Sequence, residues 1–286
     1  MRIILMTTAS LASMRPEEFA RLRDSVARSR LALPDVPIHH VLLFRDAPAD
    51  KTLPVDLHAD DIALRVDGRL SLSAARNRMI EEVRGRGYAD AGAIVAFPDD
   101  DAWYPAGFLP ELHRRFAADP SLGFWFCRYG SQPVALASQA DAAAGIGRIL
   151  RSASSNTIVL RGSLMAAMPP FDERLGVGAG LPGGEDTDYA IAAWVRGPAI
   201  ASVDAPCIGH RDYTAALRAR YYGPALAAIF RHALAVRGPR RSAELWLQLL
   251  RKVAVGATDV LRGKMRMRDY GAALQAAWRF ATQPRA

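Results

Sequence analysis

The sequence predicts an α/β fold: βαβ units around a mostly parallel central sheet, followed by a C-terminal helical extension. Two observations predict it. Short apolar runs alternate with helix-like patterns over residues 1–210, and from Asp212 onward the pattern is almost wholly helical. A chain of 286 residues, half of them hydrophobic, is long enough to bury a sizeable core. We therefore expect one large domain over residues 1–210 and a basic, amphipathic extension over residues 211–286.

The individual elements follow from caps and periodicity. Residues 2–6 read as a first strand, and the helix after it has Pro16 in its first turn and Glu17 near the positive end of its dipole. Ser71 is a good N-cap for a helix that ends at Gly85. Further strands are expected at residues 39–44, 93–97, 123–127, 157–160 and 199–203, and further helices at residues 108–116 and 187–196.

Composition argues against several classes of protein. The two cysteines, Cys127 and Cys207, lie far apart without C-x-x-C spacing, which argues against a disulfide framework or a thiolate zinc site and favours a reducing cytoplasm. The apolar start from Met1 to Met6 is too short for the core of a signal peptide. No stretch reaches the roughly 18 apolar residues of a membrane span. We expect a cytoplasmic protein that is soluble or peripheral at the inner face of the plasma membrane.

Charge favours an anionic partner, because the net charge is +8. Basic residues gather toward the C-terminus, and over residues 237–268 only Glu244 and Asp259 oppose them. Nucleic acid is not expected, since no aromatic or helix-turn-helix pattern accompanies the charge. The basic residues of this region are Arg237, Arg240, Arg241, Arg251, Lys252, Arg262, Lys264, Arg266 and Arg268.

Three consecutive carboxylates follow the expected strand at residues 93–97. Ligands of open α/β sheets gather outside the carboxyl ends of the strands, and Asp99, Asp100 and Asp101 would lie there. A solvated turn is the simpler reading of one aspartate pair. Three like charges raise one another's pKa, however, and oxygen ligands suit Mg²⁺ or Mn²⁺ with room left for substrate phosphates. The triplet therefore predicts a divalent metal site.

An ordered set of motifs resembles the family 2 glycosyltransferases, nucleotide-sugar enzymes with the GT-A fold. The segment FPDDDAWYP, residues 97–105, is similar to their D-x-D region, and Leu72 to Asn77 is similar to their small-residue A-R-N helix. Downstream, Phe171 to Gly176 is followed by Gly184-Glu185-Asp186, which matches their E-D motif. The resemblance covers residues 1–210 and implies an inverting, non-processive transferase.

The resemblance assigns five residues to the nucleotide. Asp46, at the end of the second strand, would accept a hydrogen bond from the base, and Arg76 would approach the nucleotide. Asp99 would take the ribose, and Asp100 would assist either this contact or the metal contact of Asp101. Thr8 belongs to the same group, although the first strand ends in Thr7-Thr8-Ala9-Ser10 where the family usually has Pro-Thr-x-Asn.

The resemblance also assigns the metal and the chemistry. Asp101 would bind Mn²⁺ or Mg²⁺, together with Asp99. His210 would bind the metal or the diphosphate, and a capping histidine fits the sequence equally well. Asp186 would be the general base that deprotonates the acceptor hydroxyl, with Glu185 orienting the acceptor. Favourable charge at a helix N-terminus is the simpler reading of Glu185-Asp186 taken alone.

The function implied is transfer of one sugar from a nucleotide-sugar donor, with UDP favoured, to a hydroxyl of a glycan or lipid-linked acceptor in polysaccharide biosynthesis. Two alternatives stay open: a sugar nucleotidyltransferase, which releases pyrophosphate, and a non-catalytic anion-binding module. In the basic region, Leu245, Leu249, Val253 and Val260 predict an amphipathic helix. That helix either packs on the domain with a solvated basic face or contacts an anionic membrane surface.

Overall fold

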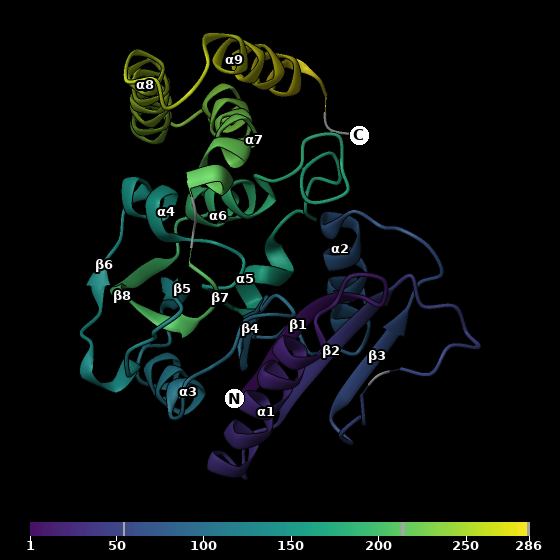
Figure 1. Cartoon of the computed structure of the whole chain (residues 1–286). Coiled ribbons are helices and arrows are strands. Elements are labelled where there is room, and N and C mark those ends of the chain that lie inside the picture. Colours follow the sequence, from purple (N-terminus) through teal and green to yellow (C-terminus); the bar gives the residue numbers. More distant parts are fainter. Residues whose placement is uncertain (54, 213–214, 285–286) are drawn as a thin grey trace.

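The computed structural model describes residues 1–53, 55–212 and 215–284, and its centre is a mixed sheet with helices on both faces (Figure 1). The expected strands are all present, and β1 and β8 extend further than the sequence indicated. The described strands are β1 (Arg2–Ser10), β2 (Ile38–Arg45), β3 (Asp61–Arg65), β4 (Ala93–Ala96), β5 (Leu122–Gly130), β6 (Ala142–Ala143), β7 (Ile158–Arg161) and β8 (Ala199–Gly209).

The sheet is mostly parallel, as predicted. Its strand order is β3-β2-β1-β4-β7-β5-β8-β6. The neighbours from β3 to β4 run parallel, and so do β5 and β8. Strand β7 is antiparallel to both β4 and β5, and the short edge strand β6 is antiparallel to β8. Because β1, β2 and β4 run the same way, their carboxyl ends meet at one edge of the sheet.

The helices of the first part alternate with the strands, and the chain after β8 is helical. Helix α2 starts as predicted, with the Ser71 hydroxyl accepting a hydrogen bond from the Ala74 amide. The described α-helices are α1 (Pro16–Ala32), α2 (Leu72–Gly85), α3 (Phe108–Ala118), α4 (Ile146–Ser152), α5 (Gly162–Ala167), α6 (Glu185–Val195), α7 (Ala215–Ala235), α8 (Pro239–Leu261) and α9 (Met267–Thr282), and η1 (Leu136–Ser138) is a short 3-10 turn.

Two apolar layers lie against the two faces of the sheet. Residues of α1 and α3, such as Phe19 and Leu112, pack with one layer. Residues of α2, α4, α5 and α6 pack with the other, where Met79 and Ile191 are buried. Helix α7 packs against α6, α8 and α9, so the C-terminal helices lie together beyond α6 and away from β1 to β3 (Figure 1).

One helix boundary differs from the prediction in a way that matters for the site. The helix expected at 187–196 begins at Glu185, because Gly184 adopts a positive φ of 80° and serves as the N-cap. Glu185 and Asp186 therefore occupy the first helical turn rather than the preceding loop. Among the described helices, we find none with the length and apolar character needed to cross a lipid bilayer.

Candidate active site

The acidic triplet lies at the carboxyl edge of the sheet, just after β4. Strands β1 and β2 end at the same edge, because β1 runs parallel to both β2 and β4. At the end of β2, Asp46 adopts a positive φ of 53° and accepts a hydrogen bond of 2.6 Å from the Ser10 hydroxyl at the end of β1. Thr8 is also on β1, and its buried hydroxyl has no hydrogen-bond partner among the described residues. The acidic triplet thus lies where the sequence led us to expect it, outside the carboxyl end of a strand.

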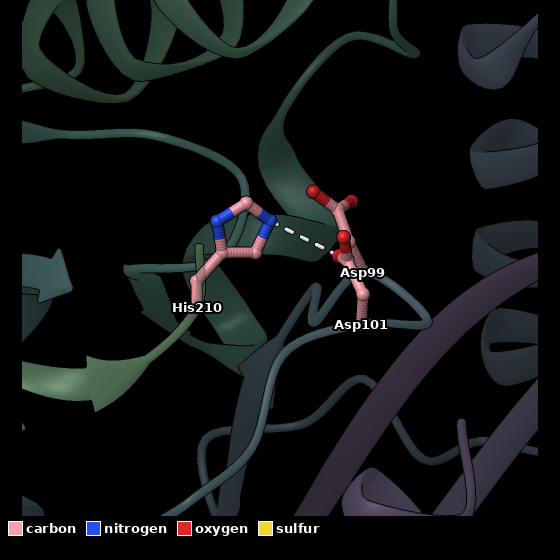
Figure 2. Close-up of side chains that lie close together, drawn as sticks. All are labelled: Asp99, Asp101 and His210. Carbon is pink, nitrogen blue, oxygen red and sulfur yellow. Dashed lines mark ion pairs between the residues drawn. The ribbon is translucent and has the colours of Figure 1, made fainter. Parts of the chain in front are cut away.

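Three side chains form a cluster that could hold a metal ion. One ligand atom from each of Asp99, Asp101 and His210 lies within 4.8 Å of the others (Figure 2). His210 Nε2 is 3.0 Å from Asp101 Oδ1. The histidine follows β8, and the carboxylates follow β4, so the sheet brings together residues that are far apart in sequence. The two carboxylates are donors that suit Mn²⁺ and Mg²⁺, and the imidazole adds a nitrogen donor of the kind that transition metals accept.

The second nitrogen of His210 fixes how the ring points. Nδ1 lies 2.8 Å from the carbonyl oxygen of Arg211, so Nδ1 carries the proton and Nε2 is aimed at Asp101. This is the arrangement by which metal-ligating histidines are usually oriented. Burial alone would lower the pKa of His210, but the Asp101 carboxylate outweighs it, and the pKa is raised above its ordinary value of 6.5. Because both nitrogens face acceptors, the structure favours the protonated ring beside Asp101, and a metal ion bound at Nε2 would displace that proton.

Arg211 is a second cation on the same carboxylate. Its Nε donates to Asp101 Oδ2 at 3.0 Å, and its Nη2 also contacts this oxygen. Burial would raise the pKa of Asp101, but the bonds and charges of His210 and Arg211 outweigh it and hold the pKa well below its ordinary value. Asp101 is thus held as an anion, which is the protonation state that metal ligation requires, and Arg211 and a protonated His210 would compete with a metal ion for it.

A backbone contact sets the distance between the two halves of this cluster. Trp103 and Gly209 exchange two hydrogen bonds of 2.9 Å between their main chains. The indole of Trp103 lies flat against Gly209, where an added Cβ would come within 1.9 Å of the ring. Only glycine allows this approach, so the loop that carries Asp101 and the strand end that carries His210 are fastened together.

Asp99 is positioned by a residue that sequence reasoning missed. The amide of Asn156 donates to Asp99 Oδ2 at 2.8 Å, and its Oδ1 accepts from the Asp99 main-chain N–H at 2.7 Å. Asn156 is buried and lies in the segment SASSNT before β7. That segment has neither helical nor strand periodicity. Only the preference of asparagine for loops that present side-chain amides could have drawn attention to it.

Arg76 joins the two acidic motifs. Its guanidinium lies 3.3 Å from Asp99 and 3.3 Å from Glu185, and its side chain is only 2% exposed. The same helix contributes Asn77, whose side-chain amide donates to the Phe171 carbonyl oxygen and accepts from the Phe171 main-chain N–H. The sequence resemblance linked Arg76 with a nucleotide. In the structure its observed partners are the carboxylates of the D-D-D and E-D segments, which therefore form one site.

The carboxyls of the E-D segment hold protons more strongly than usual. Burial, with the nearby Asp186 charge, raises the pKa of Glu185 to about 7 although Arg76 opposes the shift. Glu185 Oε2 is buried without a hydrogen-bond partner among the described residues. Burial also raises the pKa of Asp186, and Asp99 adds to it. Raised carboxyl pKa values of this kind are common among general acids and bases.

Asp100 behaves as the sequence led us to expect of a like-charged triplet. Burial and the charges of Asp99 and Asp101 raise its pKa to about 7. Its neighbour Asp101 shifts in the opposite direction because of His210 and Arg211. The structure brings Asp99, Asp101 and His210 together as a possible metal site. Asp100 is not part of this cluster.

Helix α7 closes the side of the site next to α6. The added Cβ of Gly183 would come within 2.5 Å of the Tyr221 ring, and that of Gly184 within 2.6 Å of the Pro224 carbonyl oxygen. Asp188, the third acid of α6, is buried and pairs with Arg231 and His232 of α7. Asp188 thus has a packing role, and the C-terminal helices are attached to the turn that presents Asp186.

Comparison with known proteins agrees with this fold. No protein-family model matches the chain, and no curated protein matches its sequence. The chain is similar to the crystal structure of S. aureus TarS 1-349, with a TM-score of 0.67 and 15% identity over 99% of this chain and 81% of that one. A second S. aureus TarS structure gives a TM-score of 0.62 and 13% identity, over 88% of this chain and 43% of that one. The similarity confirms the expected fold: this chain has a GT-A fold like that of TarS.

Proposed function

We propose that this protein is a metal-dependent, inverting glycosyltransferase that moves one sugar from a nucleotide-sugar donor to a hydroxyl of a glycan or lipid-linked acceptor. The observation that carries the proposal is the pairing of Arg76 with Asp99 on one side and Glu185 on the other. It joins a cation-binding group of carboxylates to a group with raised pKa values. The GT-A fold that this chain shares with S. aureus TarS supports a glycosyltransferase.

In this proposal Asp186 is the general base. Attack on an anomeric carbon needs a carboxylate within hydrogen-bond reach of the incoming hydroxyl. One oxygen of Asp186 accepts from the Thr187 amide at 2.6 Å, which holds the carboxylate at the start of α6. Burial raises its pKa and makes it a stronger base than an exposed aspartate. Glu185 orients the acceptor.

Asp99, Asp101 and His210 would hold Mn²⁺ or Mg²⁺, which would neutralise the diphosphate of the donor as it leaves. Asn156 keeps Asp99 facing the cluster, and the Nδ1 contact of His210 keeps Nε2 facing it. Thr8, Asp46 and Arg76, with Asp99 and Asp100, would contact the nucleotide. UDP is the favoured nucleotide, as in many relatives of this type.

We propose a catalytic domain over residues 1–210 and a helical extension over residues 211–286. The last strand ends at Gly209, which supports this division. The cell location we propose is the cytoplasm, with peripheral contact at the inner face of the plasma membrane.

A donor screen tests the proposal. The purified chain is incubated with UDP-, GDP- and dTDP-sugars with and without Mn²⁺, and nucleoside diphosphate and pyrophosphate are quantified separately. We expect slow metal-dependent release of one nucleoside diphosphate even without acceptor, and stabilisation against heat by that diphosphate with Mn²⁺. Pyrophosphate release would identify a nucleotidyltransferase instead. Absence of both products and of any thermal shift would refute the proposal.

A further inference from the structure

Helix α8 has an inner apolar face that is already used. Leu245 and Leu249 are buried in the same core cluster as α6 and α7, and Val253 packs against it. The sequence-based amphipathic stripe is therefore the face that packs on the rest of the protein. This packing explains the apolar residues on the inner face of α8. It does not explain the apolar residues on the opposite side of the helix.

A second apolar stripe runs along the outer face of α8. Leu247, Leu250 and Leu261 are exposed, at 47%, 63% and 86%. Ala243 and Ala254 are also exposed and continue the series at spacings of three, four and seven residues. At about 100° per residue, these five positions lie on one side of the helix, opposite Leu245 and Leu249. A continuous exposed apolar stripe is uncommon on a helix that only faces water.

Arginines accompany this stripe along one edge. Arg240, Arg251 and Arg262 are exposed and follow one another at eleven-residue intervals, so they drift by only about 20° per step around the helix. Arg240 pairs with Glu244 at the surface. Arg251 and Arg262 make no ion pair with any described residue. The outer face of α8 thus has apolar and cationic rows side by side.

The turn from α8 to α9 continues the same composition. Residues 261–268 read Leu-Arg-Gly-Lys-Met-Arg-Met-Arg, with four cations and no acid. Met267 is 68% exposed, and Lys264 and Arg266 are exposed without an ion pair to a described residue. These two cations and Asp269 help to line an open hollow of about 450 Å³ between this turn and Tyr222 of α7, which is large enough for a phosphate group.

We propose that the outer face of α8 and the α8–α9 turn dock the protein on an anionic lipid bilayer. The helix would lie in the plane of the headgroups, with Leu250, Leu261 and Met267 entering the acyl boundary. The flanking cations would meet lipid phosphates, as in other interfacial helices. A second copy of this chain suits the face poorly, because self-association would bring rows of arginines together in a protein of net charge +8.

Vesicle sedimentation of the full chain, without donor or acceptor, tests docking separately from the proposed transferase activity. The vesicles are phosphatidylcholine alone or mixed with phosphatidylglycerol. We expect binding to the anionic vesicles in about 0.05 M NaCl and release in about 0.5 M NaCl. Arg251→Gln should weaken partitioning about fivefold. Leu261→Glu should weaken it by about tenfold or more, because it places a charge in the acyl boundary.

Two controls make the same changes elsewhere on the surface. Leu31 on α1 is 83% exposed, and Arg28 on the same helix is exposed without an ion pair to a described residue. Leu31→Glu and Arg28→Gln should bind like the parent chain. If Leu261→Glu lowers the melting temperature, Met267→Glu replaces it.

Equal binding by Leu261→Glu and Leu31→Glu, or equal binding to neutral and anionic vesicles, would overturn the proposal. So would a concentration-dependent dimer in sedimentation velocity that Leu261→Glu abolishes, because the stripe would then be a contact between copies.

Discussion

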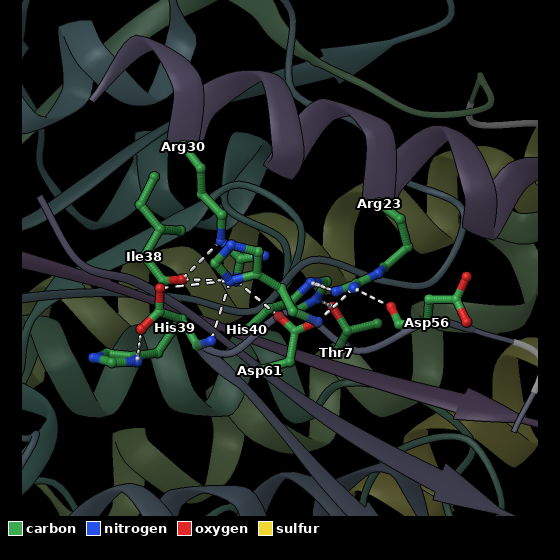
Figure 3. Close-up of polar contacts among 10 residues, drawn as sticks. Thr7, Arg23, Arg30, Ile38, His39, His40, Asp56 and Asp61 are labelled. Atoms are coloured by element: carbon green, nitrogen blue, oxygen red, sulfur yellow. Dashed lines mark hydrogen bonds and ion pairs between the residues drawn. The ribbon is translucent and has the colours of Figure 1, made fainter. Parts of the chain in front are cut away.

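Acidification should destabilise the fold through His40, a buried histidine held neutral beneath α1 (Figure 3). Its Nδ1 lies 3.1 Å from Arg23 Nη1, and its Nε2 lies 2.9 Å from the Thr7 hydroxyl. Arginine has only donors, so Nδ1 must accept and the proton must sit on Nε2. Arg23 and Arg30 also pair with buried Asp61, at 2.5 and 2.7 Å. A second proton on the ring would face a guanidinium.

The size of the effect follows from the shift in pKa. Burial, reinforced by the Arg23 charge, lowers the pKa of His40 from 6.5 to about 3. Between these values the unfolded chain binds a proton that the native protein does not, so the free energy of unfolding falls as pH falls. A pH of 5 is about 1.5 units below the pKa of the unfolded histidine, which is therefore protonated, while the native histidine stays neutral. The loss between pH 8 and pH 5 is therefore about 2 kcal/mol.

Urea unfolding of the parent chain and of His40→Gln at several pH values measures this contribution. The stability difference between them should shrink by about 2 kcal/mol from pH 8 to pH 5, because glutamine cannot titrate. Val41→Ala, next to it in β2 and equally buried, is the control; its difference from the parent should not change with pH. A pH-independent difference for His40→Gln would show that the native ring has the same pKa as in the unfolded chain, and it would refute the reasoning.

Three further predictions concern the site. Mn²⁺ binding measured by calorimetry should weaken about tenfold per pH unit below the raised pKa of His210, because a protonated ring cannot bind the ion. His210→Asn should weaken binding and remove this pH dependence. A parent affinity that does not vary with pH would count against His210 as a ligand. Asp186→Asn should lower kcat by about 10²- to 10⁴-fold while Mn²⁺-dependent nucleotide binding changes little; near-parent turnover would exclude it as the base. Asp188→Asn should lower the free energy of unfolding by about 3 kcal/mol, because His232 loses its buried anion and Arg231 keeps only Asp172; unchanged urea unfolding would contradict that role.

The elements near the site were largely predictable because their signals are local. Ser71 is followed by apolar residues at helical spacing, and the apolar run at 93–97 ends in the aspartates. In both cases the sequence pattern and the structure agree to within a few residues. The edge strand β3 was missed because its residues are only half-buried, so its polar and apolar positions do not alternate clearly. Periodicity also carries no strand direction, so the antiparallel course of β7 could not be predicted.

Other features depend on contacts between distant segments. Asn156 owes its role to its approach to Asp99, and nothing in its own neighbours indicates that approach. Arg211 could have been noticed beside His210, but its contact with Asp101 exists only once β4 and β8 lie in one sheet. On α8, the apolar residues counted in the sequence were those of the inner face. The outer stripe became visible only when the buried positions were known.

The main-chain pairing of Trp103 with Gly209 has a consequence for how such a protein can diversify. About a hundred residues lie between these two positions, and in the proposed function they include Glu185 and Asp186, which would meet the acceptor. Because the pairing joins their ends directly, insertions and deletions within that span can alter substrate choice while Asp101 and His210 keep their separation. New specificities could thus evolve around an unchanged cation site, provided that position 209 never acquires a side chain.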